Sequence, residues 1–166
     1  MEFAFGALAL QGGGPVLFTN LHITKSHQDA LLKEGRLIPD PVSCKLLLDT
    51  GADICMVKHE IAEKAEFRLL NANAPMHGVG VDTTGRRYMG RILFTFPSRI
   101  SGATATHTIW IDATIASGNF SPGIADRIDG VIGRDVLRHF EMHYDGPAGT
   151  VSLKYFRTKP NLDRNE

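Results

Sequence analysis

The stretch Lys45-Leu46-Leu47-Leu48-Asp49-Thr50-Gly51-Ala52-Asp53 decides how this chain is interpreted. Three consecutive leucines, led by the alternating Val42-Ser43-Cys44-Lys45, predict a buried β-strand. The strand ends in a carboxylate, which proteins rarely leave inside unless a partner or a reaction uses it. Gly51 permits a tight turn and the close approach of another backbone or of a ligand. Because Ile54-Cys55-Met56-Val57 is apolar again, we expect Asp49 on a tight loop between two buried strands.

The residues Asp49, Thr50 and Gly51 are also common in ordinary turns. A three-residue match arises often by chance, so a plain β-hairpin is the competing interpretation. The surrounding sequence has to distinguish the two.

Length and composition indicate one globular domain over residues 1–166. The chain has 43% hydrophobic and 22% charged residues, and its 18 basic and 18 acidic residues give a net charge of +0. These fractions are ordinary for a globular protein, and no block of like charge suggests a nucleic-acid partner.

The apolar run Phe3 to Leu10 is too short to span a bilayer, and no basic region precedes it. We therefore expect no membrane partner and no signal peptide. Cys44 and Cys55 flank the Asp loop in strand-like sequence, and we expect free, buried thiols in a reducing, cytoplasmic setting. A disulfide between them is the alternative.

Periodicity and turn residues predict the remaining elements. Ser26 is the expected N-cap of a helix that ends at Gly35. Val136, Leu137 and Phe140 are expected on one face of another short helix. The full expectation is strands over 1–10, 15–23 and 107–115, helices over 26–35 and 59–67, hairpins over 76–96 and 141–156, and a loop over 116–128.

Two further motifs fail. His59-Glu60 opens like the zinc motif H-E-x-x-H, but its fifth residue is Glu63. Gly78-x-Gly80 is followed by a strand rather than a helix, and Gly85 is out of register for a dinucleotide loop. The seven histidines have no ligand spacing. We therefore expect no metal and no cofactor.

Three segments stand in order: LLLDTGAD (46–53), the Gly78-Val79-Gly80 turn, and VIGRDVL (131–137). Together they resemble the retropepsin-like aspartic proteases, which comprise the retroviral enzymes and single-domain cellular relatives. The resemblance spans Val42 to Lys154. It implies an all-β fold: half of an acid-protease closed β-barrel, with a flap hairpin and one or two short helices. Residues 42–156 would form its core, 1–41 an N-terminal extension with a strand and a short helix, and 157–166 a polar tail.

The resemblance also implies roles. Asp49 resembles the catalytic carboxylate of an aspartic endopeptidase, and Thr50 the residue that grips its counterpart in a second subunit. Gly51 would let the substrate backbone approach, with Ala52 and Asp53 beside it. The hairpin around Gly78, Val79 and Gly80 resembles the flap that closes over bound peptide. A passive surface hairpin is the alternative.

Val131, Ile132 and Gly133 resemble the apolar segment that packs beneath the catalytic loop. Arg134 follows them, and the resemblance implies an ion pair between Arg134 and Asp53 near a dimer interface. The alternative is two independent surface charges.

The chemistry of this class needs two carboxylates that share one proton, because like charges about 3 Å apart cannot both ionise. The chain has a single Asp-Thr-Gly, since Asp82-Thr83-Thr84-Gly85 carries an extra residue. We therefore expect a C2 homodimer that acts on a polypeptide substrate, with Asp49 opposite its own copy. The strand 150–156 and the apolar N-terminus are candidates for the interface sheet.

Two other functions compete with proteolysis. A catalytically silent module on the same fold would bind extended peptide by strand addition. In a purely structural β-domain, Asp49 would only cap a turn. Ala52 also separates this chain from an acid-compartment protease, because a serine there could donate a hydrogen bond to the Asp49 carboxylate and alanine cannot. We therefore expect activity nearer neutral pH.

Overall fold

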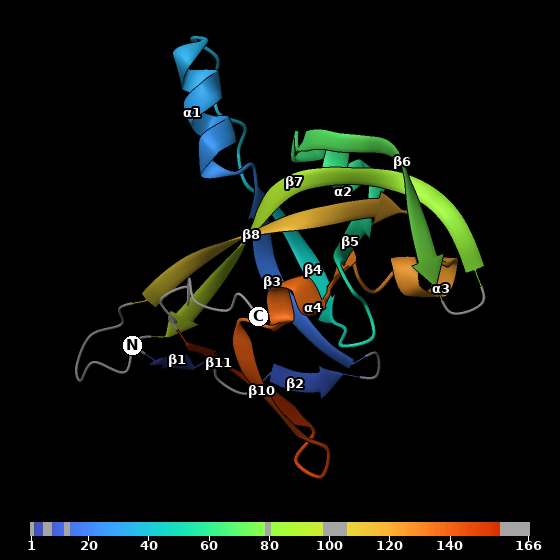
Figure 1. Cartoon of the computed structure of the whole chain (residues 1–166). Helices are drawn as coiled ribbons and strands as arrows, with labels where there is room; N and C mark the ends of the chain where they lie inside the picture. The colour runs from blue at the N-terminus through green and yellow to red at the C-terminus, as the bar shows by residue number, and fades with distance from the viewer. Residues whose placement is uncertain (1, 5–7, 12–13, 79–80, 98–105, 157–166) are drawn as a thin grey trace, which may run out of the picture.

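The computed structural model describes residues 2–4, 8–11, 14–78, 81–97 and 106–156, which are mostly β with a few short helices (Figure 1). The strands are β1 (Glu2–Ala4), β2 (Leu8–Gln11), β3 (Gly14–His22), β4 (Val42–Leu48), β5 (Cys55–Lys58), β6 (Arg68–Gly78), β7 (Val81–Pro97), β8 (Thr106–Gly118), β9 (Gly130–Ile132), β10 (Phe140–Asp145) and β11 (Thr150–Phe156). The helices are α1 (Lys25–Lys33), α2 (His59–Lys64), α3 (Pro122–Ala125) and α4 (Arg134–Leu137).

Six of the strands close into a barrel. They follow the order β3-β4-β9-β5-β8-β7, and the pairing of β7 with β3 completes the circuit. β4 pairs with β9 in parallel, and β5 pairs with β8 in parallel. The all-β class and the closed barrel are therefore confirmed. In Figure 1, α1 projects away from this barrel, and the β6–β7 hairpin arches over one side of it.

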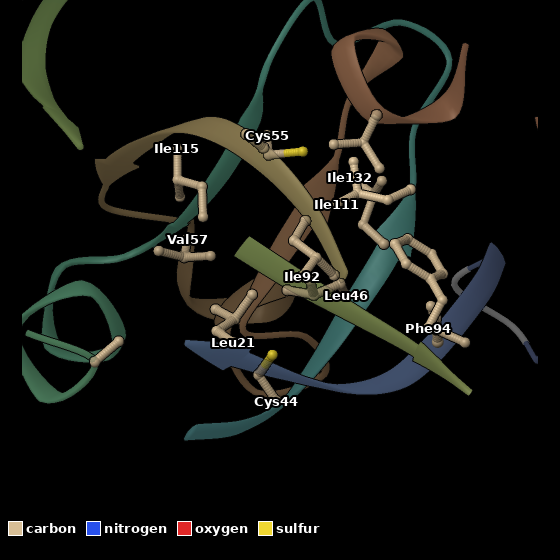
Figure 2. Close-up of a cluster of buried hydrophobic side chains, with 14 of the residues drawn as sticks. Leu21, Cys44, Leu46, Cys55, Val57, Ile92, Phe94, Ile111, Ile115 and Ile132 are labelled. Atoms are coloured by element: carbon tan, nitrogen blue, oxygen red, sulfur yellow. The ribbon is translucent and has the colours of Figure 1, made fainter. Parts of the chain in front are cut away.

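Apolar side chains from distant parts of the sequence fill the barrel (Figure 2). Alternate residues of β4 point inward, as its predicted pattern requires, and Leu46 is fully buried. Cys44 and Cys55 are buried free thiols, as expected. Burial, with a contribution from the negative charge of Asp129, raises the pKa of Cys44 to about 12. Burial also raises the pKa of the Cys55 thiol well above its usual range. Neither thiol is therefore a ready nucleophile.

The N-terminal third differs from expectation in two details. Two short strands, β1 and β2, occupy the part of 1–10 that the structure describes, in place of one strand. The helix α1 begins one residue earlier than expected because Thr24, rather than Ser26, is its N-cap. The Thr24 hydroxyl accepts a hydrogen bond from the His27 N–H at 3.3 Å. Gly35, with φ of +70°, follows the helix end as predicted.

The hairpin and the later loop also differ from expectation. The hairpin starts at Arg68 rather than at 76, and the segment 82–85 lies in β7. Of the proposed flap residues, Gly78 ends β6, while Val79 and Gly80 lie outside the described residues, as does the tail 157–166. β8 runs on to Gly118, and α3 forms inside the expected loop. Phe140 begins β10 because it packs on Phe94, with ring centroids 4.8 Å apart.

Asp129, which immediately precedes β9, links this strand to β4 and β5. Its carboxylate accepts hydrogen bonds from the Lys45 N–H at 2.9 Å and from the Lys58 ammonium at 3.0 Å. Burial alone would raise the pKa of Asp129, but these hydrogen bonds and the nearby positive charges hold it below its ordinary value. The contact thus stabilises the fold above the unfolded-state pKa, and the stabilisation is lost as the pH falls through the folded-state pKa.

We expect Asp129→Asn to lower the free energy of unfolding by about 1–2 kcal/mol at pH 7. The difference from wild type should shrink below about pH 4, where the wild-type carboxylate also becomes protonated. Urea unfolding at pH 7 and pH 3 measures it, with the exposed Asp40→Asn as the matched control. An equal deficit at both pH values would contradict this assignment.

Candidate functional site

Asp49 lies at the end of β4, where a second strand fixes its backbone. Leu48 stands opposite Ile132 of β9, and the Asp49 N–H donates to the Ile132 carbonyl at 3.0 Å. The Gly51 N–H donates to Oδ1 of Asp49 at 2.8 Å. A Cβ at position 51 would lie 3.1 Å from that oxygen, which is a crowded contact. Glycine therefore leaves the room that the carboxylate needs.

The segment that follows β9 braces the other half of the loop. The Arg134 N–H donates to the Ala52 carbonyl at 2.8 Å, and the Asp135 N–H donates to the Asp53 carbonyl at 3.1 Å. The Arg134 guanidinium donates to the Thr50 carbonyl at 3.2 Å and forms an ion pair with Asp53. The expected pairing of Arg134 with Asp53 is thus present, and the alternative of two independent charges is wrong.

Gly133, which follows β9, packs directly against the backbone of the Asp49 loop at Ile54. A Cβ there would lie 2.5 Å from the carbonyl carbon of Ile54 and 2.6 Å from its oxygen. No side-chain rotation relieves a clash with backbone, so any larger residue has to push the loop away from β9.

We therefore expect Gly133→Ala to lower the free energy of unfolding by about 2–3 kcal/mol. Gly123→Ala is the matched control, because an added Cβ there meets nothing within 4 Å. Urea denaturation of both variants measures the effect. Equal stability of the two variants would show that the loop does not need this close contact.

Cys55 and Asp135 form a polar contact behind the loop that the sequence analysis missed. The Cys55 thiol donates to Oδ1 of Asp135 at 3.3 Å and accepts from the Gly133 N–H at 3.4 Å. Burial raises the pKa of the Asp135 carboxyl, and its hydrogen bonds only partly offset this. The two residues are 80 positions apart and match no motif, so only the fold brings them together.

A cavity of about 840 Å³ opens at the Asp49 loop. Four of the predicted site residues line it from the loop: Asp49, Gly51, Ala52 and Asp53. The β6–β7 hairpin lines it with Pro75, Met76, Thr84 and Arg87. Thus the carboxylate and the hairpin face one shared space.

Val131 lines the cavity as well, whereas Ile132, Gly133, Arg134 and Thr50 are not part of its wall. The stretch after β8 supplies wall residues that the sequence analysis left in a loop, namely Asn119, Phe120 and Ile124. The sequence around these three residues matches no motif and resembles that of an ordinary loop, so it did not indicate a site.

Within the described residues, no three or more acidic, histidine or cysteine side chains cluster as metal ligands would. None of the helices in that part of the chain is long and apolar enough to cross a membrane.

Comparison with solved structures gives a similarity of fold. The chain is similar to a solved structure described as a retropepsin-like aspartic protease from Rickettsia conorii. The two are 16% identical, the match covers 93% of this chain and 98% of that one, and the TM-score is 0.43. No family model and no curated protein matches the sequence.

Proposed function

We propose that this protein is an aspartic endopeptidase whose active site forms between two copies of Asp49 in a C2 homodimer. The observation that carries the proposal is the position of Asp49. Its carboxylate ends a buried strand, sits on a loop braced by backbone hydrogen bonds, and faces a cavity of about 840 Å³. A carboxylate held this rigidly at a cavity wall is suited to act on a bound molecule.

The reaction follows from two such carboxylates sharing one proton. The ionised Asp49 takes a proton from a water molecule between the two copies, and that water attacks the peptide carbonyl carbon. The protonated copy donates a hydrogen bond to the developing oxyanion and then helps to protonate the leaving amine. One chain supplies half of this arrangement, so the second copy is needed for chemistry.

β1, β6 and β10 each pair with one strand among the described residues, and we infer that the dimer forms at the free edge of β10. Within the described residues, β11 pairs with β10 on one side and with β1 and β2 on the other, whereas β10 pairs only with β11. The earlier candidate, 150–156, is therefore interior to its sheet. α4 packs against β10, and its first residue, Arg134, is paired with the Asp49 loop. This neighbourhood supports an interface at β10 that brings the loops together.

The sequence of β10 favours one register for antiparallel pairing with its copy. With Met142 on the twofold axis, Glu141 faces His143 of the other copy, and Phe140 faces Tyr144. The first is a carboxylate–imidazole pair that can hydrogen-bond, and the second is an aromatic pair. A register centred on His143 would instead oppose Glu141 and Asp145, which repel. Met142 and Tyr144 are 37% and 60% exposed in the single chain, so a partner has apolar surface to cover.

The β6–β7 hairpin supports the proposed role of a flap. Its residues Pro75, Met76 and Thr84 line the same cavity as the Asp49 loop. We propose that this hairpin covers an extended peptide. The buried free thiols Cys44 and Cys55 support a reducing setting such as the cytoplasm.

Ala52 offers a test of the pH range. It follows the Asp49 turn, with its N–H donating to the Asp49 carbonyl at 3.3 Å, and it lines the cavity. We expect Ala52→Ser to move the pH optimum of cleavage down by about half a unit or more, because the added hydroxyl favours the ionised carboxylate. The pH profile of kcat/KM measures it. An optimum that stays in place would count against this role of Ala52.

The proposal is tested by incubating the dimeric protein with a mixed peptide library at several pH values, with and without pepstatin. Pepstatin-sensitive cleavage is the expected result. Library peptides that bind without being cut would favour the silent peptide-binding module, and neither binding nor cleavage would favour the purely structural domain.

A further inference from the structure

Arg87 is a cation on the cavity wall without an anionic partner. Its Nη2 donates to the Pro75 carbonyl at 3.0 Å, and its Nε lies out of solvent with no acceptor. No carboxylate among the described residues lies within ion-pair distance of Arg87. Other arginines of β7 differ, since Arg86 pairs with Glu63 and Arg91 pairs with Asp112. A half-buried guanidinium whose N–H donors lack acceptors destabilises the protein, unless a ligand supplies those acceptors.

Strand register directs this side chain into the cavity. Arg87 stands opposite Ala116 of β8, and both residues line the cavity, whereas the next residue, Tyr88, is buried in the barrel core. The two carboxylates that line the cavity, Asp49 and Asp53, lie on the loop after β4. Asp53 is already paired with Arg134, and Asp49 lies beyond ion-pair distance of Arg87. The hairpin wall therefore offers positive charge that the protein itself does not neutralise.

Apolar residues line much of the cavity that Arg87 lines. Met56, Ile128 and Val131 line the same cavity, so a bound peptide would exclude water from much of it. In such surroundings a guanidinium attracts an anion more strongly than it does in water. A carboxylate matches the planar fork of an arginine and can accept two parallel hydrogen bonds from it.

We propose that Arg87 binds a carboxylate of the substrate, so that the protein selects peptides with an acidic group close to the scissile bond. The group is either a Glu or Asp side chain or a free C-terminal carboxylate, since both present the same chemistry. This inference rests on the proposed endopeptidase function and names a specificity-determining residue for it. A structural clamp that only ties β7 to Pro75 is the competing role.

The test uses peptide pairs that differ by Glu against Gln at one position, scanned across the four residues on each side of a cleaved bond. A second set compares free with amidated C-termini. Wild type, Arg87→Gln and Arg86→Gln are assayed for kcat/KM on each pair. Arg86→Gln is the matched control, because Arg86 is the exposed neighbour outside this cavity. The same pairs are titrated against Asp49→Asn by fluorescence anisotropy, which reads binding even where no cleavage occurs.

We expect wild type and Arg86→Gln to prefer the acidic member of one pair by at least about tenfold. Arg87→Gln should lower this ratio to about one. A preference in the Glu/Gln set would identify a side-chain carboxylate as the group that Arg87 binds. A preference in the second set would identify the C-terminal carboxylate. Cleavage without any acidic preference overturns the inference and leaves the protease intact. An equal loss on both members of a pair in Arg87→Gln also overturns it, in favour of the clamp. Absence of all cleavage would refute the proposed function. The ratio of dissociation constants for the acidic and neutral peptides, measured by anisotropy, would then test the role of Arg87.

Discussion

Asp49→Asn is expected to lower kcat/KM for peptide cleavage by at least about 10⁴-fold, because loss of a reacting group in a cooperating set removes most of the catalysis. In a homodimer the substitution removes both carboxylates together. The asparagine keeps a side-chain oxygen that can accept from the Gly51 N–H, now at 2.8 Å from Asp49. The loop should therefore hold its shape, with the free energy of unfolding changed by less than about 1 kcal/mol.

Three measurements separate chemistry from structure in this variant. Steady-state cleavage of a peptide identified from the library gives the rate, urea denaturation gives the stability, and the exposed Asp40→Asn is the control for a lost charge. Retained cleavage in Asp49→Asn would refute the catalytic role. If the variant loses stability in proportion to its activity, Asp49 serves the turn and not the reaction.

Met142→Lys is expected to convert the dimer into a folded monomer without measurable cleavage at ordinary assay concentrations. In the proposed register the two copies of Met142 meet on the twofold axis, so the variant sets two positive charges against each other. Like charges facing across an interface cost several kcal/mol, and we expect the dissociation constant to rise by at least about 100-fold. Because Met142 is 37% exposed in the single chain, a lysine there should leave the barrel intact.

Analytical ultracentrifugation gives the assembly state of this variant, and cleavage assays over a range of protein concentration give the activity. The control is Leu37→Lys, which adds the same charge at a residue that is 93% exposed and lies outside β10. Activity of Met142→Lys should return as its concentration is raised toward its dissociation constant. A dimer of undiminished affinity would rule out the β10 edge, and a fully active monomer would rule out the need for a second copy.

The sequence predicts the parts of this protein that local pattern controls. The alternating 42–48 stretch becomes β4, and Asp49 lies on the loop after it. Each of these follows from short motifs whose residues lie close together or in a fixed order. The 141–156 hairpin is equally local, since a glycine-containing turn joins two alternating runs.

The features that the sequence did not predict depend on contacts between distant parts of the chain. Closure of the barrel by β3 and β7 and the contact of Cys55 with Asp135 join segments about 70 or more residues apart. Arg87 had no distinguishing signal, because its lack of a partner depends on which carboxylates the fold brings near. The interior position of β11 was hidden for a similar reason, since it depends on where β1 and β2 pair. Such features belong to the tertiary structure and not to any window of sequence.

Mixing of subunits tests the requirement for two copies of Asp49 most directly. Wild type and Asp49→Asn carrying different tags are unfolded together and refolded, with wild type held constant and the variant in about tenfold excess. Random pairing then leaves wild-type dimers at about one eleventh of their original amount. Recovery of doubly tagged dimers verifies the exchange. The account predicts that cleavage falls to about one tenth of the wild-type rate. Cleavage that stays at the wild-type rate would show that each subunit works alone and would contradict it.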